Sequence, residues 1–114
     1  MNIDGQAKLL RIYIGEADKW QGQPLSMAIL LKARELGLAG GTVLRGIAGY
    51  GANSVIHTAN ILRLSEDLPI VLEFVDSAEK IQAFLPTLNA MVHEGLVVLL
   101  DVEVVHYKAS QEQG

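Results

Sequence analysis

The order in which the spacing of apolar residues changes along the chain constrains its fold more than any other feature. In residues 8–15 the aliphatic side chains of Leu10, Ile12 and Ile14 recur at every second position, which is the spacing of a half-buried strand. In residues 81–92 the apolar side chains recur every three or four positions instead, as they do along one face of a helix. The chain therefore combines strands with helices.

Further strands and one more helix complete this order. Pro24 suits the first position of a helix, because its missing N–H has no intrahelical partner there. That helix is expected to run to Leu36, with Gly37 as a left-handed stop. Extended segments are expected at residues 42–48, at residues 61–64 continuing into residues 69–75, and at residues 96–107.

The helix predicted around residues 81–92 carries signals at both ends and a helix breaker inside. Asp76 or Ser77 can cap its N-terminus, Glu79 complements the helix dipole, and Gly95 is expected to end the helix. Pro86 lies within the pattern, where it removes one backbone hydrogen bond. A bend is expected at this position.

The predicted order is strand, helix, strand, strand, helix, strand, which is the split βαβ arrangement of ferredoxin-like domains. We therefore predict the α+β class, with an antiparallel sheet and both helices on one face. Apolar residues also occur on the second face of the sheet, at Val71 and Val75. Because no helix remains to cover that face, we expect another subunit to bury it.

Length and composition exclude several classes of protein. The 114 residues, half of them apolar, suit one domain over residues 1–114, with flexible ends at residues 1–6 and 109–114. The absence of cysteine excludes a disulfide framework. A net charge of -4, with nine scattered Lys and Arg residues, argues against a nucleic-acid partner. No apolar run is long enough to span a bilayer and no signal peptide is evident, so we expect a cytoplasmic protein without direct membrane insertion.

Glycine is concentrated between Gly37 and Gly51, and Gly46 and Gly49 belong to the densest part of this segment. Backbone N–H groups in such a segment can approach a ligand closely. The segment lacks the Gly-Lys-Ser/Thr ending of a P-loop, and it does not open a helix as a dinucleotide fingerprint does. The alternative is a tight strand exit whose glycines need positive φ angles.

Arg45 and Arg63 flank this loop, and pairing of the strands on either side can bring them together. Guanidinium groups suit a phosphate or a carboxylate. The alternative is ion pairing with Glu66, Asp67 or a neighbouring subunit.

The histidines and the single tryptophan give weaker signals. His57, His93 and His106 are far apart, and none has the spacing of a metal site. His93 near a helix end and His106 late in the last strand are interpreted as structural, whereas His57 lies in the central loop and can contact a polar ligand. No serine or threonine is paired with a base, so we assign neither catalytic nor metal-binding residues. Trp20 has polar neighbours and is expected to be exposed, where it can stack on a flat ligand or anchor a subunit contact.

Segments spread over nearly the whole chain resemble one known family. They are residues 15–16 (GE), 20 (W), 24–25 (PL), 33–40 (ARELGLAG), 42–47 (TVLRGI), 49–51 (GYG), 56–58 (IHT), 64–69 (LSEDLP), 84–86 (FLP) and 91–97 (MVHEGLV). In these segments the chain resembles the PII-like proteins of domain-of-unknown-function family 190.

The resemblance implies a ferredoxin-like homotrimer related to the nitrogen-regulatory PII signal transducers, which bind adenine nucleotides between subunits and present a loop to partner proteins. Residues 49–60 occupy the place of that loop in a much shorter form. The turn at Gly95 occupies the place of a phosphate-binding turn, here with one glycine and no lysine. Tyr50 is not interpreted as a modification site, because its flanking glycines can equally make it a wall of the cleft.

Our functional hypothesis is a trimeric sensor, not an enzyme, that binds a small anionic ligand between subunits and regulates a partner protein such as a transporter or an enzyme. An adenine nucleotide is one candidate ligand. The residues expected to contact the ligand are Arg45, Gly46, Gly49, Tyr50, Gly51, His57, Arg63 and Gly95. The alternatives are a small enzyme that uses His57 in the same cleft, and a trimer of similar fold related to metal-tolerance proteins.

Overall fold

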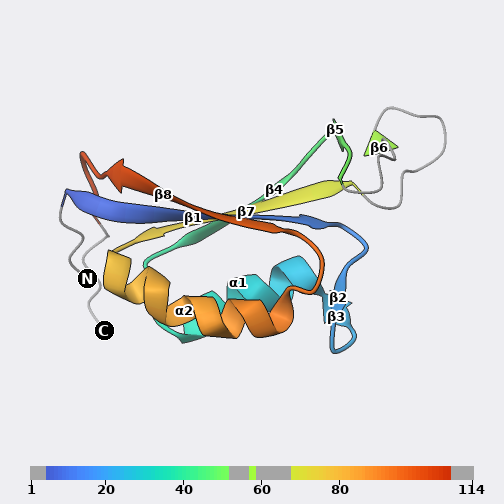
Figure 1. Cartoon of the computed structure of the whole chain (residues 1–114), viewed down its shortest axis with the longest axis horizontal. Helices are drawn as coiled ribbons and strands as arrows, with labels where there is room; N and C mark the ends of the chain where they lie inside the picture. The colour runs from blue at the N-terminus through green and yellow to red at the C-terminus, as the bar shows by residue number, and fades with distance from the viewer. Residues whose placement is uncertain (1–4, 52–56, 59–67, 109–114) are drawn as a thin grey trace.

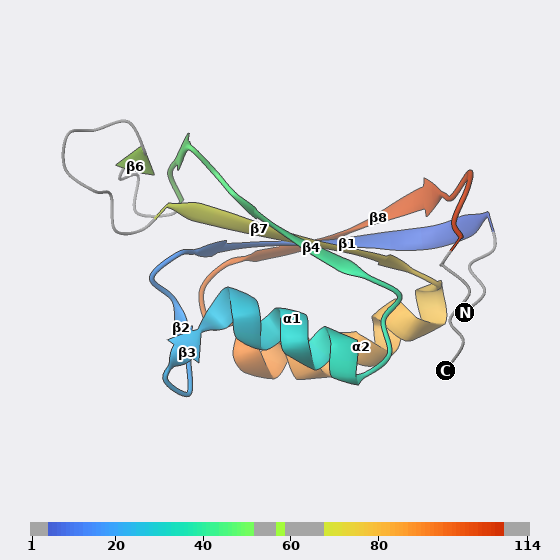
Figure 2. The ribbon, with the colours of Figure 1, turned by 180° about the vertical axis from the view of Figure 1, so that it is seen from behind.

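The computed structural model describes residues 5–51, 57–58 and 68–108. Its elements, in chain order, are β1 (Gln6–Gly15), β2 (Lys19–Trp20), β3 (Gln23–Pro24), α1 (Leu25–Glu35), β4 (Gly41–Arg45), β5 (Ala48–Gly49), β6 (His57–Thr58), β7 (Pro69–Asp76), α2 (Ala78–Met91) and β8 (Leu96–Glu103). Strands β4, β7, β1 and β8 form a four-stranded antiparallel sheet in that order. Both helices lie on one face of this sheet (Figures 1 and 2). The predicted α+β class and the ferredoxin-like order are confirmed.

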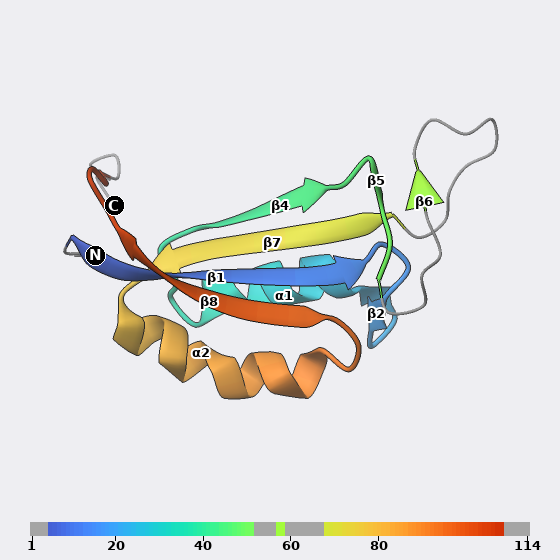
Figure 3. The same cartoon turned by 45° about the horizontal axis from the view of Figure 1, so that its top comes forward.

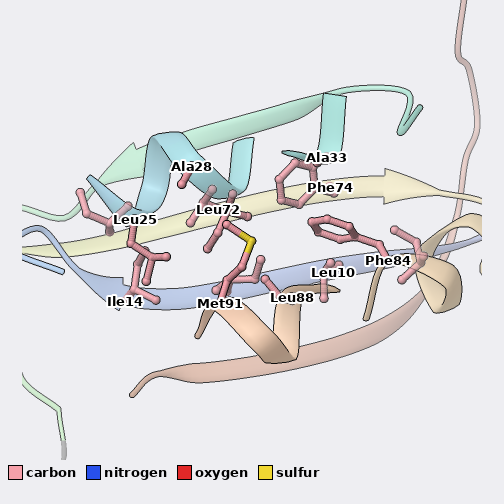
Figure 4. Close-up of a cluster of buried hydrophobic side chains, with 14 residues drawn as sticks. Leu10, Ile14, Leu25, Ala28, Ala33, Leu72, Phe74, Phe84, Leu88 and Met91 are labelled. Carbon is pink, nitrogen blue, oxygen red and sulfur yellow. The ribbon is translucent and has the colours of Figure 1, made fainter. Parts of the chain in front are cut away.

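The hydrophobic core lies between the two helices and the inner face of the sheet. Leu10 and Ile12 of β1 are fully buried there, and so is Leu72 of β7, because alternate residues of a strand point to the same face. Phe74 of β7 meets Phe84 of α2 edge to face, with ring centroids 6.0 Å apart (Figure 4). The apolar residues that recur at strand spacing and those that recur at helical spacing thus pack together in one core.

Both helices begin within one residue of the predicted positions. Pro24, predicted as the first residue of the first helix, is the N-cap of α1, and the predicted last residue, Leu36, is its C-cap. Gly37 follows with a positive φ of 89°. Ser77 caps α2, and its side chain accepts a hydrogen bond from the Lys80 N–H. Local chemistry therefore accounts for these ends.

Helix α2 runs through Pro86 and ends at Met91, before the predicted end at Gly95. Pro86 lies on the exposed side of the helix, where a carbonyl group that loses its N–H partner can bind water. Val92 is already extended. The chain leaves the helix early because it must turn to place Leu96 beside Tyr13 in β1.

Strands β4 and β8 are shorter than predicted, because each ends where its partner ends. Among the strands that the structure describes, β8 pairs only with β1, and Glu103 lies opposite Gln6, the first residue of β1. The expected strand up to residue 107 is therefore wrong, and His106 lies beyond the strand. β4 ends at Arg45, opposite Ile70 near the start of β7. The extended segment predicted at residues 61–64 lies outside the described residues.

The outer face of the sheet, seen in Figure 3, carries no helix of the described chain. The pairing register places apolar side chains in two rows across this face, Leu44, Val71, Tyr13 and Leu96 in one and Val75, Leu9 and Leu100 in the other. Between the rows, Arg11 Nε and Glu73 Oε2 form an ion pair at 2.8 Å. The hydrogen bond to Glu73 raises the pKa of Arg11 above its ordinary value. The outer face is therefore apolar around a central pair of opposite charges.

Candidate ligand site at one end of the sheet

One end of the sheet gathers most of the residues that the sequence analysis singled out. Arg45 at the end of β4 pairs with Ile70, and Gly15 at the end of β1 pairs with Pro69. The beginning of β8 lies at the same end, since Leu96 pairs with Tyr13. The β5–β6 ribbon and the β2–β3 hairpin project from this end of the sheet (Figure 1). We call it the loop end.

Arg45 forms an ion pair at the loop end with a residue that the sequence analysis did not propose for it. Arg45 Nε lies 3.0 Å from Glu16 Oε2, and Arg45 Nη2 donates to Glu16 Oε1 at 3.3 Å. The Arg45 side chain is nevertheless 57% exposed. Glu66 and Asp67, the acidic residues considered for this role, lie outside the described residues.

Gly46 and Gly49 are required by close packing against Pro69, not by positive φ angles. A Cβ atom at Gly46 would lie 2.7 Å from Pro69 Cγ, and one at Gly49 would lie 2.8 Å from the same atom. Neither glycine has a positive φ. A Cβ at Gly51, by contrast, would meet no atom of the described residues within 4 Å. The alternative interpretation of these glycines, a strand exit that needs positive φ angles, is therefore wrong at Gly46 and Gly49.

The chain beyond β4 continues as a short two-stranded ribbon. Gly49 of β5 pairs with His57 of β6, and Ala48 pairs with Thr58. The backbone of His57 thus lies opposite a predicted ligand residue, while its side chain and all of Arg63 lie outside what the structure describes. Tyr50 directly follows β5 and is 71% exposed.

Gly95 lies at the loop end but far from Arg45 across the sheet. Its φ of 155° and the Tyr13 carbonyl oxygen, 2.7 Å from where a Cβ would lie, require glycine here. Strands β7 and β1 separate β4 from β8, so three inter-strand spacings of about 4.8 Å put the two sites about 14 Å apart. The chain by itself therefore brings Arg45, Gly46, Gly49 and the His57 backbone together, and leaves Gly95 apart.

Trp20 is not exposed as predicted. It is partly buried and packs against the core, because the β2–β3 hairpin folds back beside the start of α1. The Asp18 side chain accepts a hydrogen bond from Gly15 N–H, and the Asp18 carbonyl accepts one from Leu25 N–H. The tryptophan therefore packs beside the connection from β1 to α1.

A depression of about 490 Å³ lies away from the loop end, between the start of β4, the outer face of β7 and the segment after β8. Its lining comes from Ala39, Gly40, Gly41, Thr42, Glu73, Val75, Val104, His106 and Tyr107. None of the predicted ligand residues whose side chains the structure describes belongs to it.

The described residues contain no cluster of three His, Asp or Glu side chains that could hold a metal ion. Among the helices that the structure describes, none has the length and apolar character needed to cross a membrane.

Comparison with solved structures defines the class of this fold. A PII-like signaling protein from Thermus thermophilus is similar with a TM-score of 0.64 and 20% identity, over 90% of this chain and 94% of that one. A nitrogen regulatory PII-like protein from Thiomonas intermedia, bound to ADP, AMP and bicarbonate, gives a TM-score of 0.57 and 22% identity, over 89% and 90% of the two chains. At these identities the likeness concerns the fold, which is that of PII-like proteins.

The sequence comparisons then identify the family. Residues 7–104 match DUF190, described as "Uncharacterized ACR". A UPF0166 protein of Aquifex aeolicus is 42% identical over 99 residues, covering 87% of this chain and 93% of the relative. A UPF0166 protein of Methanocaldococcus jannaschii is 38% identical over 100 residues, covering 87% and 92%. The chain belongs to the DUF190 family.

Proposed function

We propose that this protein is a PII-like sensor that binds a small anionic ligand between the subunits of a homotrimer, with an adenine nucleotide as the leading candidate. The observation that carries the proposal is Arg45, whose side chain is 57% exposed beside the closely packed Gly46 and Gly49. A guanidinium at such a position suits the oxygens of a phosphate or a carboxylate. The PII-like protein of Thiomonas intermedia, which shares the fold, is bound to ADP, AMP and bicarbonate.

The outer face of the sheet supports the proposed trimer. Tyr13, Leu44, Leu96 and Leu100 are each more than a third exposed on that face. Contiguous apolar surface of this kind favours association. Association would also explain how Gly95 joins the site, because only a neighbouring chain can bring its own Gly95 turn close to Arg45.

Two exposed side chains that flank β5 support the proposed contact of the β5–β6 ribbon with a regulated partner, such as a transporter or an enzyme of the cytoplasm. Ile47 is 79% exposed and Tyr50 is 71% exposed, and both lie close in sequence to Arg45. A ligand at Arg45 would sit at the base of this ribbon and could change its position. In this proposal the protein signals to its partner whether the ligand is bound, and it performs no catalysis.

Isothermal titration calorimetry with ADP, AMP and bicarbonate tests the ligand site. ADP is expected to bind the wild type, and Arg45→Gln should weaken binding about tenfold or more, since a hydrogen bond to a charged group contributes ~1.5–3 kcal/mol. Arg34→Gln, which removes the same group from an exposed position on α1, is the matched control and should bind as the wild type does. Failure of all three ligands to bind an assembled oligomer would contradict the proposal.

A further inference from the structure

The centre of the outer face carries one ion pair, formed by Arg11 of β1 and Glu73 of β7. The two residues lie opposite each other on the two central strands of the sheet. Their row continues to Thr42 on β4 and to Val98 on β8, between the two apolar rows. Within the four strands of this sheet, all of which the structure describes, the pairing register places no other Asp, Glu, Lys or Arg on the outer face. The pair is therefore the charged centre of an apolar surface.

Both side chains keep hydrogen-bonding groups that the pair itself does not use. Arg11 Nε donates to Glu73 Oε2 at 2.8 Å, and the two side chains are 30% and 31% exposed. A guanidinium has five N–H donors and a carboxylate has two acceptor oxygens. Even with a second hydrogen bond from Arg11 to the Tyr13 side chain, Arg11 has N–H groups left for another acceptor. Water can bind these groups while the face is exposed, but a subunit that covers the face must replace that water with its own polar groups.

A second copy of the same face offers the groups that Arg11 and Glu73 require. Because Glu73 is the acidic residue that the strands present on this face, Glu73 of the neighbouring subunit is the acceptor that Arg11 can meet. Contacts of this head-to-tail kind close into a ring. In a trimer, each subunit would then place its Arg11 against one neighbour and its Glu73 against the other.

We propose that the Arg11–Glu73 pair is the recognition element of the subunit contact: Arg11 of one subunit also donates to Glu73 of the next, and this fixes the register in which two outer faces meet. Apolar rows alone specify a register weakly, because apolar contact is non-directional. A shift of register, by contrast, leaves both charges buried without their partners. This inference rests on the homotrimer proposed above, and it assigns two residues to the recognition of a second copy of this chain.

The double variant Arg11→Glu/Glu73→Arg tests the proposal, because it reverses both charges and keeps an ion pair within each chain. It should assemble by itself as the wild type does, since opposite charges still meet between its subunits. In a mixed trimer, like charges meet wherever a variant subunit adjoins a wild-type subunit, which disfavours that contact. The variant is co-expressed with a mass-tagged wild type, and native mass spectrometry measures the share of mixed trimers. Random association would give about three quarters mixed trimers, and we expect that share to fall at least about fivefold.

Lys32→Glu/Glu35→Lys is the matched control, because it reverses an ion pair on α1, which covers the opposite face of the sheet. This variant should form mixed trimers with the wild type at the random share. If Arg11→Glu/Glu73→Arg also mixes at the random share, the pair does not reach between subunits, and its proposed role is overturned while the trimer stands. A monomeric wild type would refute the trimer itself together with this role.

If the charge-reversed variant does not assemble, Arg11→Met/Glu73→Leu provides the second test, since it replaces the pair with apolar side chains of similar size. The outer faces should then still associate, but in more than one register. Because ring closure depends on the angle at which subunits meet, light scattering coupled to size exclusion should show several oligomer sizes where the wild type shows one. A single trimeric species would overturn the proposal.

Discussion

Gly46→Ala is expected to destabilise the protein, because the added methyl group has no room beside Pro69. A Cβ at this position would lie 2.7 Å from Pro69 Cγ and 3.3 Å from the Pro69 carbonyl oxygen. Pro69 cannot retreat freely, since it pairs with Gly15 of β1 and its carbonyl accepts the Gly46 N–H. Relief of the contact must therefore move the end of β4 away from β7.

The size of the effect follows from the cost of overpacking, which is typically ~1–3 kcal/mol. For a chain of this length each kcal/mol lowers Tm by about 4 °C, so we expect Tm to fall by roughly 4–12 °C. Gly51→Ala is the matched control, because no atom of the described part of the chain lies within 4 Å of its added Cβ. It should leave Tm unchanged or raise it by up to about 4 °C, through the smaller entropy of the unfolded chain.

Differential scanning calorimetry measures both variants and the wild type at one subunit concentration, because the Tm of an oligomer depends on concentration. If Gly46→Ala melts together with Gly51→Ala, the contact with Pro69 is not what requires glycine at residue 46. Close approach of a ligand would then be the better explanation of the glycine cluster.

Leu100→Arg on the outer face should convert the proposed trimer into smaller species, because an unpaired charge would be buried, and light scattering coupled to size exclusion measures this change. Met27→Arg on α1 is the control and should not change the assembly, since Met27 is 43% exposed and Leu100 is 39% exposed. Equal behaviour of the two variants would contradict the proposed interface. Asp76→Asn should lower the free energy of unfolding measured in urea by ~1–3 kcal/mol. The fully buried carboxylate accepts hydrogen bonds from the Ala39 and Ser77 N–H groups at 2.8 and 2.6 Å, and one of them must be lost when an oxygen is replaced by an NH2 group. An unchanged urea midpoint and slope would show that these bonds do not contribute to stability.

The types and order of the main elements could be predicted because they depend on local spacing. Leu10, Ile12 and Ile14 share one side of β1, and Ile81, Phe84 and Leu88 share one side of α2, so each pattern reports the face that meets the core. The ends that local chemistry controls, at Ser77 and Gly37, could be predicted for the same reason.

The features that depend on distant segments could not be predicted in this way. The end of β8 is set by where β1 begins, and the burial of Trp20 depends on how the hairpin folds back on the core. The partner of Arg45 was missed because Glu16 belongs to another strand end, and the sequence offers no local signal that joins them.

The sequence by itself thus determined the alternation of strands and helices, the faces that form the core, and the presence of glycine and arginine around residue 46. Only the tertiary structure decided which contacts those residues make. It placed Pro69 against Gly46 and Gly49, set Glu16 beside Arg45, and separated Gly95 from them by two intervening strands. The physical reason is that the spacing of apolar residues shows only which side chains of an element face the core. The contacts and charges at the loop end depend instead on how the ends of four strands pack together.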